Sequence, residues 1–101
     1  MSEIVVMATG PLHGGTVDRL ARDLAEAVAD RPARLVVDLT ACTRIDAAAV
    51  EALLRAHSQM LRNQGTLALR RPQHRVRRTL RLARVDHVLE VEDAAPLADA
   101  R

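Results

Sequence analysis

Aromatic residues and lysine are absent from this sequence of 101 residues, and cysteine occurs once, as Cys42. The core must therefore be built from Leu, Val, Ile, Met and Ala, and there is no aromatic ring on which a nucleic-acid base could stack. A single cysteine excludes an internal disulfide and a zinc site made of several cysteines. No apolar run approaches the roughly 20 residues that a membrane-spanning helix needs. No signal peptide is visible either, so the sequence predicts a cytoplasmic protein.

The length and charge of the chain are typical of one small globular domain. Residues 1–101 suit a single domain, and a hydrophobic content of 49% is normal for such a domain. All fifteen basic residues are arginine, but acidic residues almost balance them and the formal net charge is +2. So small an excess does not by itself predict binding to nucleic acid or to a membrane surface.

Strand-like and helix-like segments alternate along the chain. Short, largely apolar runs predict strands, whereas apolar residues spaced three and four positions apart, such as Val17, Leu20, Ala21 and Leu24, predict amphipathic helices. The expected strands are residues 4–8, 35–39, 66–69 and part of 85–91, and the expected helices are residues 16–30, 46–63 and 72–83. This order predicts an α/β fold in which helices cover a central sheet of about four strands with parallel neighbours.

Several residues at the expected helix ends suit capping positions. Thr16 and Asp46 could accept hydrogen bonds from first-turn N–H groups of the first two helices. Gly65 suits the left-handed position after the second helix. Asp93 could cap a further helical turn, and we expect the glycine-containing residues 10–15 to form a loop.

No arrangement of residues typical of an enzyme is present. The four histidines, His13, His57, His74 and His87, show no metal-ligand spacing and accompany no nucleophile motif. His57 falls beside the apolar stripe of the second helix, where a half-buried packing role is expected. Cys42 lies near Arg44, which could lower a thiol pKa, but a buried and unreactive cysteine is the simpler expectation. The sequence therefore predicts neither catalysis nor a cofactor or metal.

The most basic stretch is residues 70–84, which contain seven arginines. A nucleic-acid-binding surface would use such a stretch. The third helix, however, must place Val76, Leu80 and Ala83 in the core, so only part of its surface can be basic. A solvated face, able to meet an acidic protein, is the simpler interpretation, and a nucleic-acid binder remains the less favoured alternative.

A motif spans the junction between the second strand and the second helix. Residues 36–40 (VVDLT) read as a strand ending in Asp-Leu-Thr, and residues 45–46 (ID) lead into residues 50–54 (VEALL). Residues 63–69 contain a glycine turn before the third strand, and residues 75–91 supply a helix and a closing segment. This pattern covers nearly the whole chain and resembles the STAS domain of the bacterial anti-sigma factor antagonist type.

The resemblance implies a protein-binding module controlled by phosphorylation, but the controlled position differs here. In that family, a serine or threonine one or two residues after the helix-start aspartate is phosphorylated by the partner, an anti-sigma factor that is also a kinase. In this chain those positions are Ala47 and Ala48, and Ala49 replaces a glycine. The resemblance therefore implies a non-catalytic, anti-sigma factor antagonist-like protein that keeps the docking surface and lacks the phosphorylation site.

The resemblance also indicates the partner and the residues that would meet it. The expected partner is an anti-sigma factor with a histidine-kinase-like ATP-binding domain. The expected partner-binding residues are Asp46, Ala47, Ala48, Ala49, Val50 and Glu51. Asp38 is expected to order the preceding loop by accepting backbone hydrogen bonds, and the nearest hydroxyls to which regulation could have moved are on Thr40, Thr43 and Ser58. A STAS subunit of a transporter-associated or lipid-transport complex is the main alternative.

Overall fold

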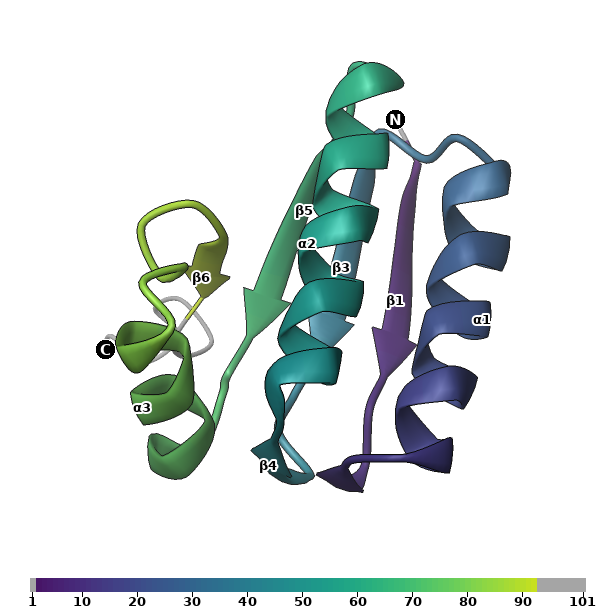
Figure 1. The fold of residues 1–101 in the computed structure, drawn as a ribbon. Coiled ribbons are helices and arrows are strands. Elements are labelled where there is room, and N and C mark those ends of the chain that lie inside the picture. Colours follow the sequence, from purple (N-terminus) through teal and green to yellow (C-terminus); the bar gives the residue numbers. More distant parts are fainter. Residues whose placement is uncertain (1, 93–101) are drawn as a thin grey trace, which may run out of the picture.

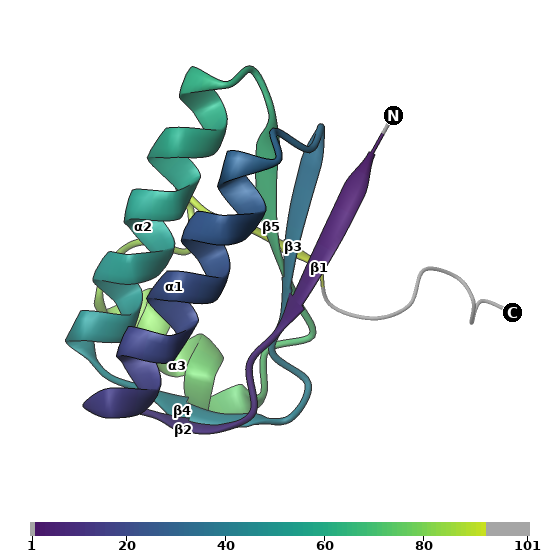
Figure 2. The ribbon, with the colours of Figure 1, turned by 90° about the vertical axis from the view of Figure 1, so that its right-hand side faces the viewer.

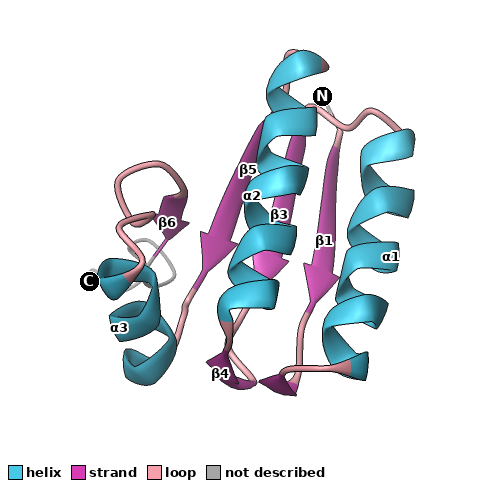
Figure 3. Cartoon of the chain, viewed as in Figure 1, coloured by secondary structure: helices cyan, strands magenta, loops and turns pink. Residues whose placement is uncertain are grey.

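A computed structural model of the chain describes residues 2–92. Its elements in chain order are β1 (Glu3–Met7), β2 (Gly10–Leu12), α1 (Gly15–Ala29), β3 (Arg34–Asp38), β4 (Cys42–Ile45), α2 (Ala47–Arg62), β5 (Thr66–Arg70), α3 (His74–Leu82) and β6 (Glu90–Glu92) (Figure 1). Long helices and strands alternate as the sequence pattern predicts (Figure 3). The expected cap at Asp93 lies outside the described residues.

Four strands form one parallel sheet in the order β1-β3-β5-β6. Helices α1 and α2 lie side by side against one face of this sheet, as both ribbon views show (Figures 1 and 2). The predicted α/β fold, with a central sheet of about four strands and helices packed against it, is confirmed. Helix α3 packs near one end of the molecule, where it contacts β4.

The hydrophobic core fills the space between the sheet and the two long helices. Alternate residues of a strand point to opposite faces of the sheet. The core residues on β3 and β5 are Leu35, Val37, Leu67 and Leu69, and Ile4 and Val6 of β1 pack against the core. From the helix side, Leu53 and Met60 are 0% exposed. The core is thus aliphatic, as the absence of aromatic residues requires.

A second, two-stranded parallel sheet pairs β2 with β4. The sequence pattern indicated a loop at β2, because the strand is three residues long and contains Pro11. Proline is tolerated there because both strands of a two-stranded sheet are edge strands. Leu12 pairs with Ile45, and the Asp46 N–H donates to the Leu12 carbonyl at 3.2 Å. This small sheet therefore fixes the residue that precedes α2.

The start of α1 differs from the expectation for Thr16. The helix begins at Gly15, and Gly14 occupies the cap position without a side-chain hydrogen bond. The Thr16 hydroxyl lies within hydrogen-bond distance of the carbonyl oxygens of Pro11 and His13, and it accepts from the His13 N–H at 2.9 Å. Thr16 therefore holds the loop before α1 rather than capping the helix.

The turn after α2 also differs from the expectation for Gly65. The left-handed residue is Gln64, with φ 64°. A Cβ added to Gly65 would lie 2.7 Å from Met60 Cε and 2.9 Å from the Pro32 carbonyl oxygen. Glycine is therefore needed at this position because the neighbouring chain approaches closely, and not because of a positive φ.

Candidate functional site

The start of α2 is held by Asp46, which confirms the predicted cap. Asp46 is extended (φ −109°, ψ −177°), and its Oδ1 accepts a hydrogen bond from the Ala49 N–H at 2.9 Å. The first backbone bond of the helix runs from the Val50 N–H to the Asp46 carbonyl at 3.1 Å. The N–H groups of Ala47 and Ala48 precede that bond, so the helix itself offers them no acceptor.

The six predicted partner-binding residues divide into a surface set and a buried set. Ala47, Ala48 and Glu51 are exposed, and Asp46 is half-buried. Ala49 is 0% exposed and Val50 is 6% exposed, because both point into the core. Those two residues can shape the helix start from beneath but cannot offer side chains to a partner. Asp46, Ala47, Ala48 and Glu51 together make up the candidate docking surface, called the docking surface.

The docking surface offers small side chains at the positive end of a helix dipole. The dipole and the free N–H groups of the first turn favour an anion at such a position. Neither Ala47 nor Ala48 has a hydroxyl that could receive a phosphoryl group. The hydroxyls nearest to them along the sequence are exposed: Thr40 lies before β4, Thr43 lies on β4, and Ser58 lies further along α2.

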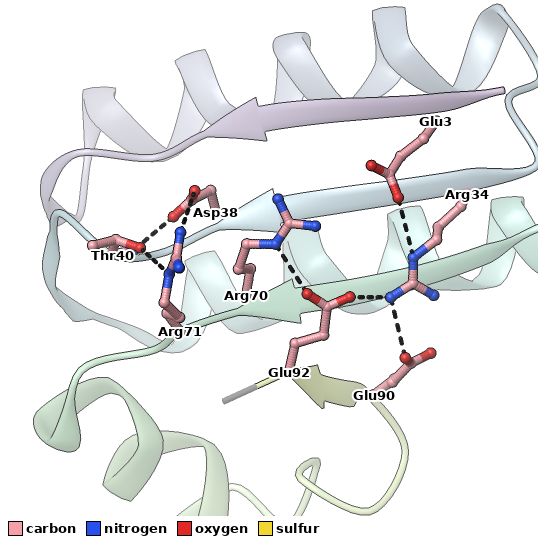
Figure 4. Close-up of polar contacts among 8 residues, drawn as sticks. All are labelled: Glu3, Arg34, Asp38, Thr40, Arg70, Arg71, Glu90 and Glu92. Carbon is pink, nitrogen blue, oxygen red and sulfur yellow. Dashed lines mark hydrogen bonds and ion pairs between the residues drawn. The ribbon is translucent and has the colours of Figure 1, made fainter. Parts of the chain in front are cut away.

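Asp38, at the end of β3, contacts the loop that leads to β4 and α2. Its Oδ1 accepts a hydrogen bond from the Thr40 N–H at 2.9 Å, and its Oδ2 lies 3.9 Å from Arg71 Nη2. Arg71 Nε also donates to the Thr40 hydroxyl at 3.2 Å (Figure 4). Gln73 Nε2 donates to the Thr40 carbonyl at 2.8 Å. Hydrogen bonds from Thr40, chiefly from its side chain, and the positive charge of Arg71 lower the pKa of Asp38. These contacts are the ones that a loop-ordering role for Asp38 requires.

Cys42 and His57, which the sequence offered as possible reactive residues, both pack against other parts of the protein. Cys42 is 0% exposed, and desolvation raises the pKa of its thiol, which disfavours the reactive thiolate. His57 is half-buried on α2, and its Nδ1 is buried without a hydrogen-bond partner among the described residues.

Within residues 2–92, no group of three or more His, Cys, Asp or Glu side chains has an arrangement that could hold a metal ion. None of the helices in that range is long and apolar enough to cross a membrane.

Two of the seven arginines of residues 70–84 are engaged by contacts within the chain. Arg70 donates to Glu92 at 2.9 Å, and Arg71 contacts Thr40 and Asp38. Val76 and Leu80 are 0% exposed, as the core role predicts. Ala83, expected in the core as well, is exposed just beyond the end of α3.

Sequence reasoning missed an ion-pair network on the sheet face opposite α1 and α2. Arg34 on β3 pairs with Glu3 on β1 at 3.4 Å, with Glu90 on β6 at 3.3 Å, and with Glu92 on β6. Glu92 also pairs with Arg70 on β5 at 2.9 Å. Figure 4 views this face, with the helices behind the sheet. These bonds lower the pKa of Glu92, chiefly through Arg70, and raise the pKa of Arg34, chiefly through Glu92.

The signal for this network was present in the sequence but could not be used without the strand order. Glu3, Arg34 and Thr66 are the first residues of their strands and lie in register across β1, β3 and β5. Their side chains therefore share one face at one end of the sheet. Only the placement of the short strand β6 beside β5 shows that Glu90 and Glu92 complete the set.

Comparison with known proteins gives a family match over most of the chain. The model of the STAS domain family matches residues 2–98. No curated protein gives a significant match to the sequence.

Solved structures share the fold at low sequence identity. An anti-sigma factor antagonist from Mycobacterium paratuberculosis is 23% identical, with 96% of this chain and 81% of that chain covered and a TM-score of 0.81. The anti-sigma factor antagonist SpoIIAA in its unphosphorylated form is 16% identical, with 99% and 87% covered and a TM-score of 0.81. The STAS domain of a SulP transporter from Vibrio cholerae is 14% identical, with 92% and 74% covered and a TM-score of 0.71. Identities this low establish a common fold and nothing finer.

Proposed function

The chain belongs to the STAS domain family, and we propose that it is a non-catalytic binding protein of the anti-sigma factor antagonist type. Of the three solved structures compared with the chain, two carry that description and one is a transporter domain. The observation that carries the proposal is the docking surface. Its exposed residues Ala47 and Ala48 are small at the point where Asp46 caps the helix, so a partner could approach the backbone closely there.

The proposed partner is an anti-sigma factor that contains a histidine-kinase-like ATP-binding domain. Such a partner would phosphorylate a hydroxyl at the start of α2 in related proteins. A phosphate there would add about −1.5 to −2 charges at pH 7, and the helix N-terminus would tolerate it. The fold would then persist while the docking surface became bulky and anionic.

In this protein the docking surface has no off-switch of that kind. Ala47 and Ala48 cannot be phosphorylated, so the surface stays small and uncharged at those positions whatever the activity of the kinase. We therefore propose a constitutive antagonist that acts in the bacterial cytoplasm on the control of transcription. It would hold its partner at all times, and control would rest on the amounts of the two proteins.

A second candidate is a STAS subunit of a transporter-associated complex. The observation that favours it is the shared fold with the SulP transporter domain. Isolation of the tagged protein from its own host, followed by mass spectrometry, distinguishes the candidates. Recovery of an anti-sigma factor supports the proposal, and recovery of transport proteins without one supports the second candidate.

The direct test of the proposed function is calorimetric titration of the purified protein with the ATP-binding domain of an anti-sigma factor from the same host. We expect a one-to-one complex. The titration is repeated with Ala48→Glu, which changes the docking surface, and with Arg81→Glu, which changes an exposed residue of α3. Absence of binding by the parent protein to every such domain of the host would contradict the proposal.

A further inference from the structure

Strand β1 has one edge that no described strand covers. It is the outermost strand of the sheet and pairs only with β3. The Ala8 N–H donates to the Asp38 carbonyl, and the Ser2 carbonyl accepts from the Arg34 N–H, so the even-numbered residues face β3. Because the backbone groups of successive strand residues alternate in direction, Glu3, Val5 and Met7 present their N–H and C=O groups to the uncovered edge. Figure 2 looks onto this side of the molecule.

The uncovered edge has only one of the features by which proteins usually protect such strands, the charged side chain of Glu3 at its first residue. Protective features include proline, a β-bulge and lysine side chains. The sequence of β1 is EIVVM, and its register with β3 is regular from Glu3 to Met7. Val5 is 43% exposed and Met7 is 65% exposed, although both are apolar. The free edge of β1 can therefore pair with another strand.

A groove runs beside the edge, between β1 and α1. Its apolar lining comes from β1 and from Ala27, and its acidic lining comes from Asp23 and Glu26 of α1 and from Asp30, which caps the end of that helix. The three acids recur at intervals of three and four residues, so they lie on one face of the helix. No described basic side chain lies within 4 Å of their carboxylates. The groove therefore combines free backbone groups, apolar surface and unpaired negative charge.

We propose that the β1 edge binds an extended, basic segment of a partner protein, which adds as a fifth strand to the sheet. Main-chain bonds to Glu3, Val5 and Met7 would give affinity, and alternate side chains would give specificity. Side chains of the added strand that point to the helix side of the sheet would meet the three acids, so arginine or lysine is favoured at those positions. Side chains of the added strand that point to the opposite side would meet Val5 and Met7, so apolar residues are favoured at those positions.

A second copy of the chain fits this edge poorly. A symmetric pair formed through β1 would bring the acids of one α1 towards the acids of the other, and like charges at such an interface are unfavourable. The proposal also concerns a surface separate from the start of α2, so it depends on neither the partner nor the activity proposed above.

The test uses two fluorescent, capped heptapeptides in which valine and arginine alternate. In one peptide the backbone nitrogens of the arginines are methylated, and in the other those of the valines are. Each peptide can therefore pair through one edge only and cannot form extended sheets by itself. A peptide that joins the sheet must turn one set of its N–H groups toward β1. With arginine side chains on the helix side, these are the N–H groups of the arginines if the peptide runs parallel to β1, and those of the valines if it runs antiparallel. We expect one peptide to bind at least about tenfold more tightly than the other.

Matched protein variants locate the binding site. Val5→Pro removes an outward N–H and should weaken the tighter peptide about tenfold, whereas Val5→Thr keeps that N–H and should change little. The triple variant Asp23→Asn, Glu26→Gln, Asp30→Asn alters only exposed side chains, so folding should be retained. It should weaken binding about tenfold at low ionic strength and remove most of the salt dependence.

Three results would overturn the proposal. The first is that neither peptide binds at low ionic strength. The second is that both bind equally and respond only to salt, which would indicate general charge attraction without strand addition. The third is a dimer of the protein that Val5→Pro dissociates, because a second copy would then be the occupant of the edge.

Discussion

The start of α2 and the sheet face opposite the helices use their surface residues in opposite ways. On the sheet face, Arg34 and Arg70 both pair with Glu92, and each of the three side chains is 27–30% exposed. At the start of α2 the exposed residues are Ala47, Ala48 and Glu51, and no described basic side chain pairs with Glu51. The first surface is occupied by internal contacts, and the second is available to a partner.

This difference predicts that substitutions on the sheet face affect the stability of the fold, whereas substitutions at the start of α2 affect partner binding. Charges that are paired within the chain should affect unfolding when they are changed and should leave partner binding alone. Small residues at an exposed helix start should do the reverse, because they contribute few contacts within the chain. Substitutions at the two surfaces therefore test whether stability and binding are separate.

The largest effect is expected for Ala48→Glu on binding. A carboxylate in the first turn is favoured by the helix dipole by about 0.3–1 kcal/mol, and Glu costs little relative to Ala in helix propensity. Thermal stability should hold or rise slightly. The partner would have to desolvate an unpaired charge, at a cost on the order of several kcal/mol, which weakens binding by roughly 10²-fold or more. Calorimetry and melting curves measure the two quantities.

Ala48→Ser is the matched control for that variant. An unphosphorylated hydroxyl adds little bulk and no charge, so affinity and melting temperature should both stay close to the parent values. If Ala48→Glu folds normally and binds as tightly as Ala48→Ser, the start of α2 is not the interface.

The next effect is loss of the α2 cap in Asp46→Ala. The Asp46 carboxylate accepts from the Ala49 N–H, and removal of such a cap costs about 0.5–2 kcal/mol. Urea unfolding should show this loss, and Asp46→Asn should restore most of the stability because its amide oxygen can accept the same bond. A stability of Asp46→Ala equal to that of the parent would mean that the cap contributes nothing.

A smaller effect is expected for Glu92→Gln in the ion-pair network. Glu92 pairs with both Arg34 and Arg70, and partly exposed pairs contribute roughly 0.2–1 kcal/mol each. We expect the free energy of unfolding to fall by about 1 kcal/mol while partner affinity stays the same. Glu90→Gln is the control, since the Glu90 side chain is 52% exposed and should contribute little. A change in partner affinity with Glu92→Gln would break the separation of the two surfaces.

The smallest effect is a pH dependence of stability. The folded-state pKa values of Glu92 and Asp38 are lowered from ordinary values of 4.5 and 3.8. A lowered pKa gives stability that is fully present above the unfolded value and is lost as the pH falls through the folded value. Melting temperatures should therefore decline below about pH 4.5. The decline should be shallower in the double variant Asp38→Asn, Glu92→Gln. An identical decline in the variant would assign the loss to other carboxylates.

The sequence alone was sufficient for features determined by local pattern. Apolar spacing located the long helices, the run at residues 35–39 located a central strand, and Asp46 was recognisable as a cap because capping requires a short polar side chain before a helix. These signals depend on residues within one or two turns of one another.

Features that depend on contacts between distant segments could not be predicted. The β2–β4 pair joins two very short strands about 30 residues apart in the chain, and neither strand has a pattern of its own. Gly65 has its role because Pro32 and Met60 approach it. The burial of Ala49 and Val50 depends on which face of α2 meets the sheet at its first turn, and this narrows the docking surface proposed from the sequence.

The central claim, a docking surface that a kinase cannot switch off, is tested most directly by one affinity measured twice. The protein is incubated with its anti-sigma factor and Mg-ATP, recovered, and titrated again into fresh partner by calorimetry. We predict the same affinity before and after, and no phosphate in peptides that cover residues 44–54. A large loss of affinity that accompanies stoichiometric phosphate on Thr40, Thr43 or Ser58 would contradict the claim and show that the switch has moved.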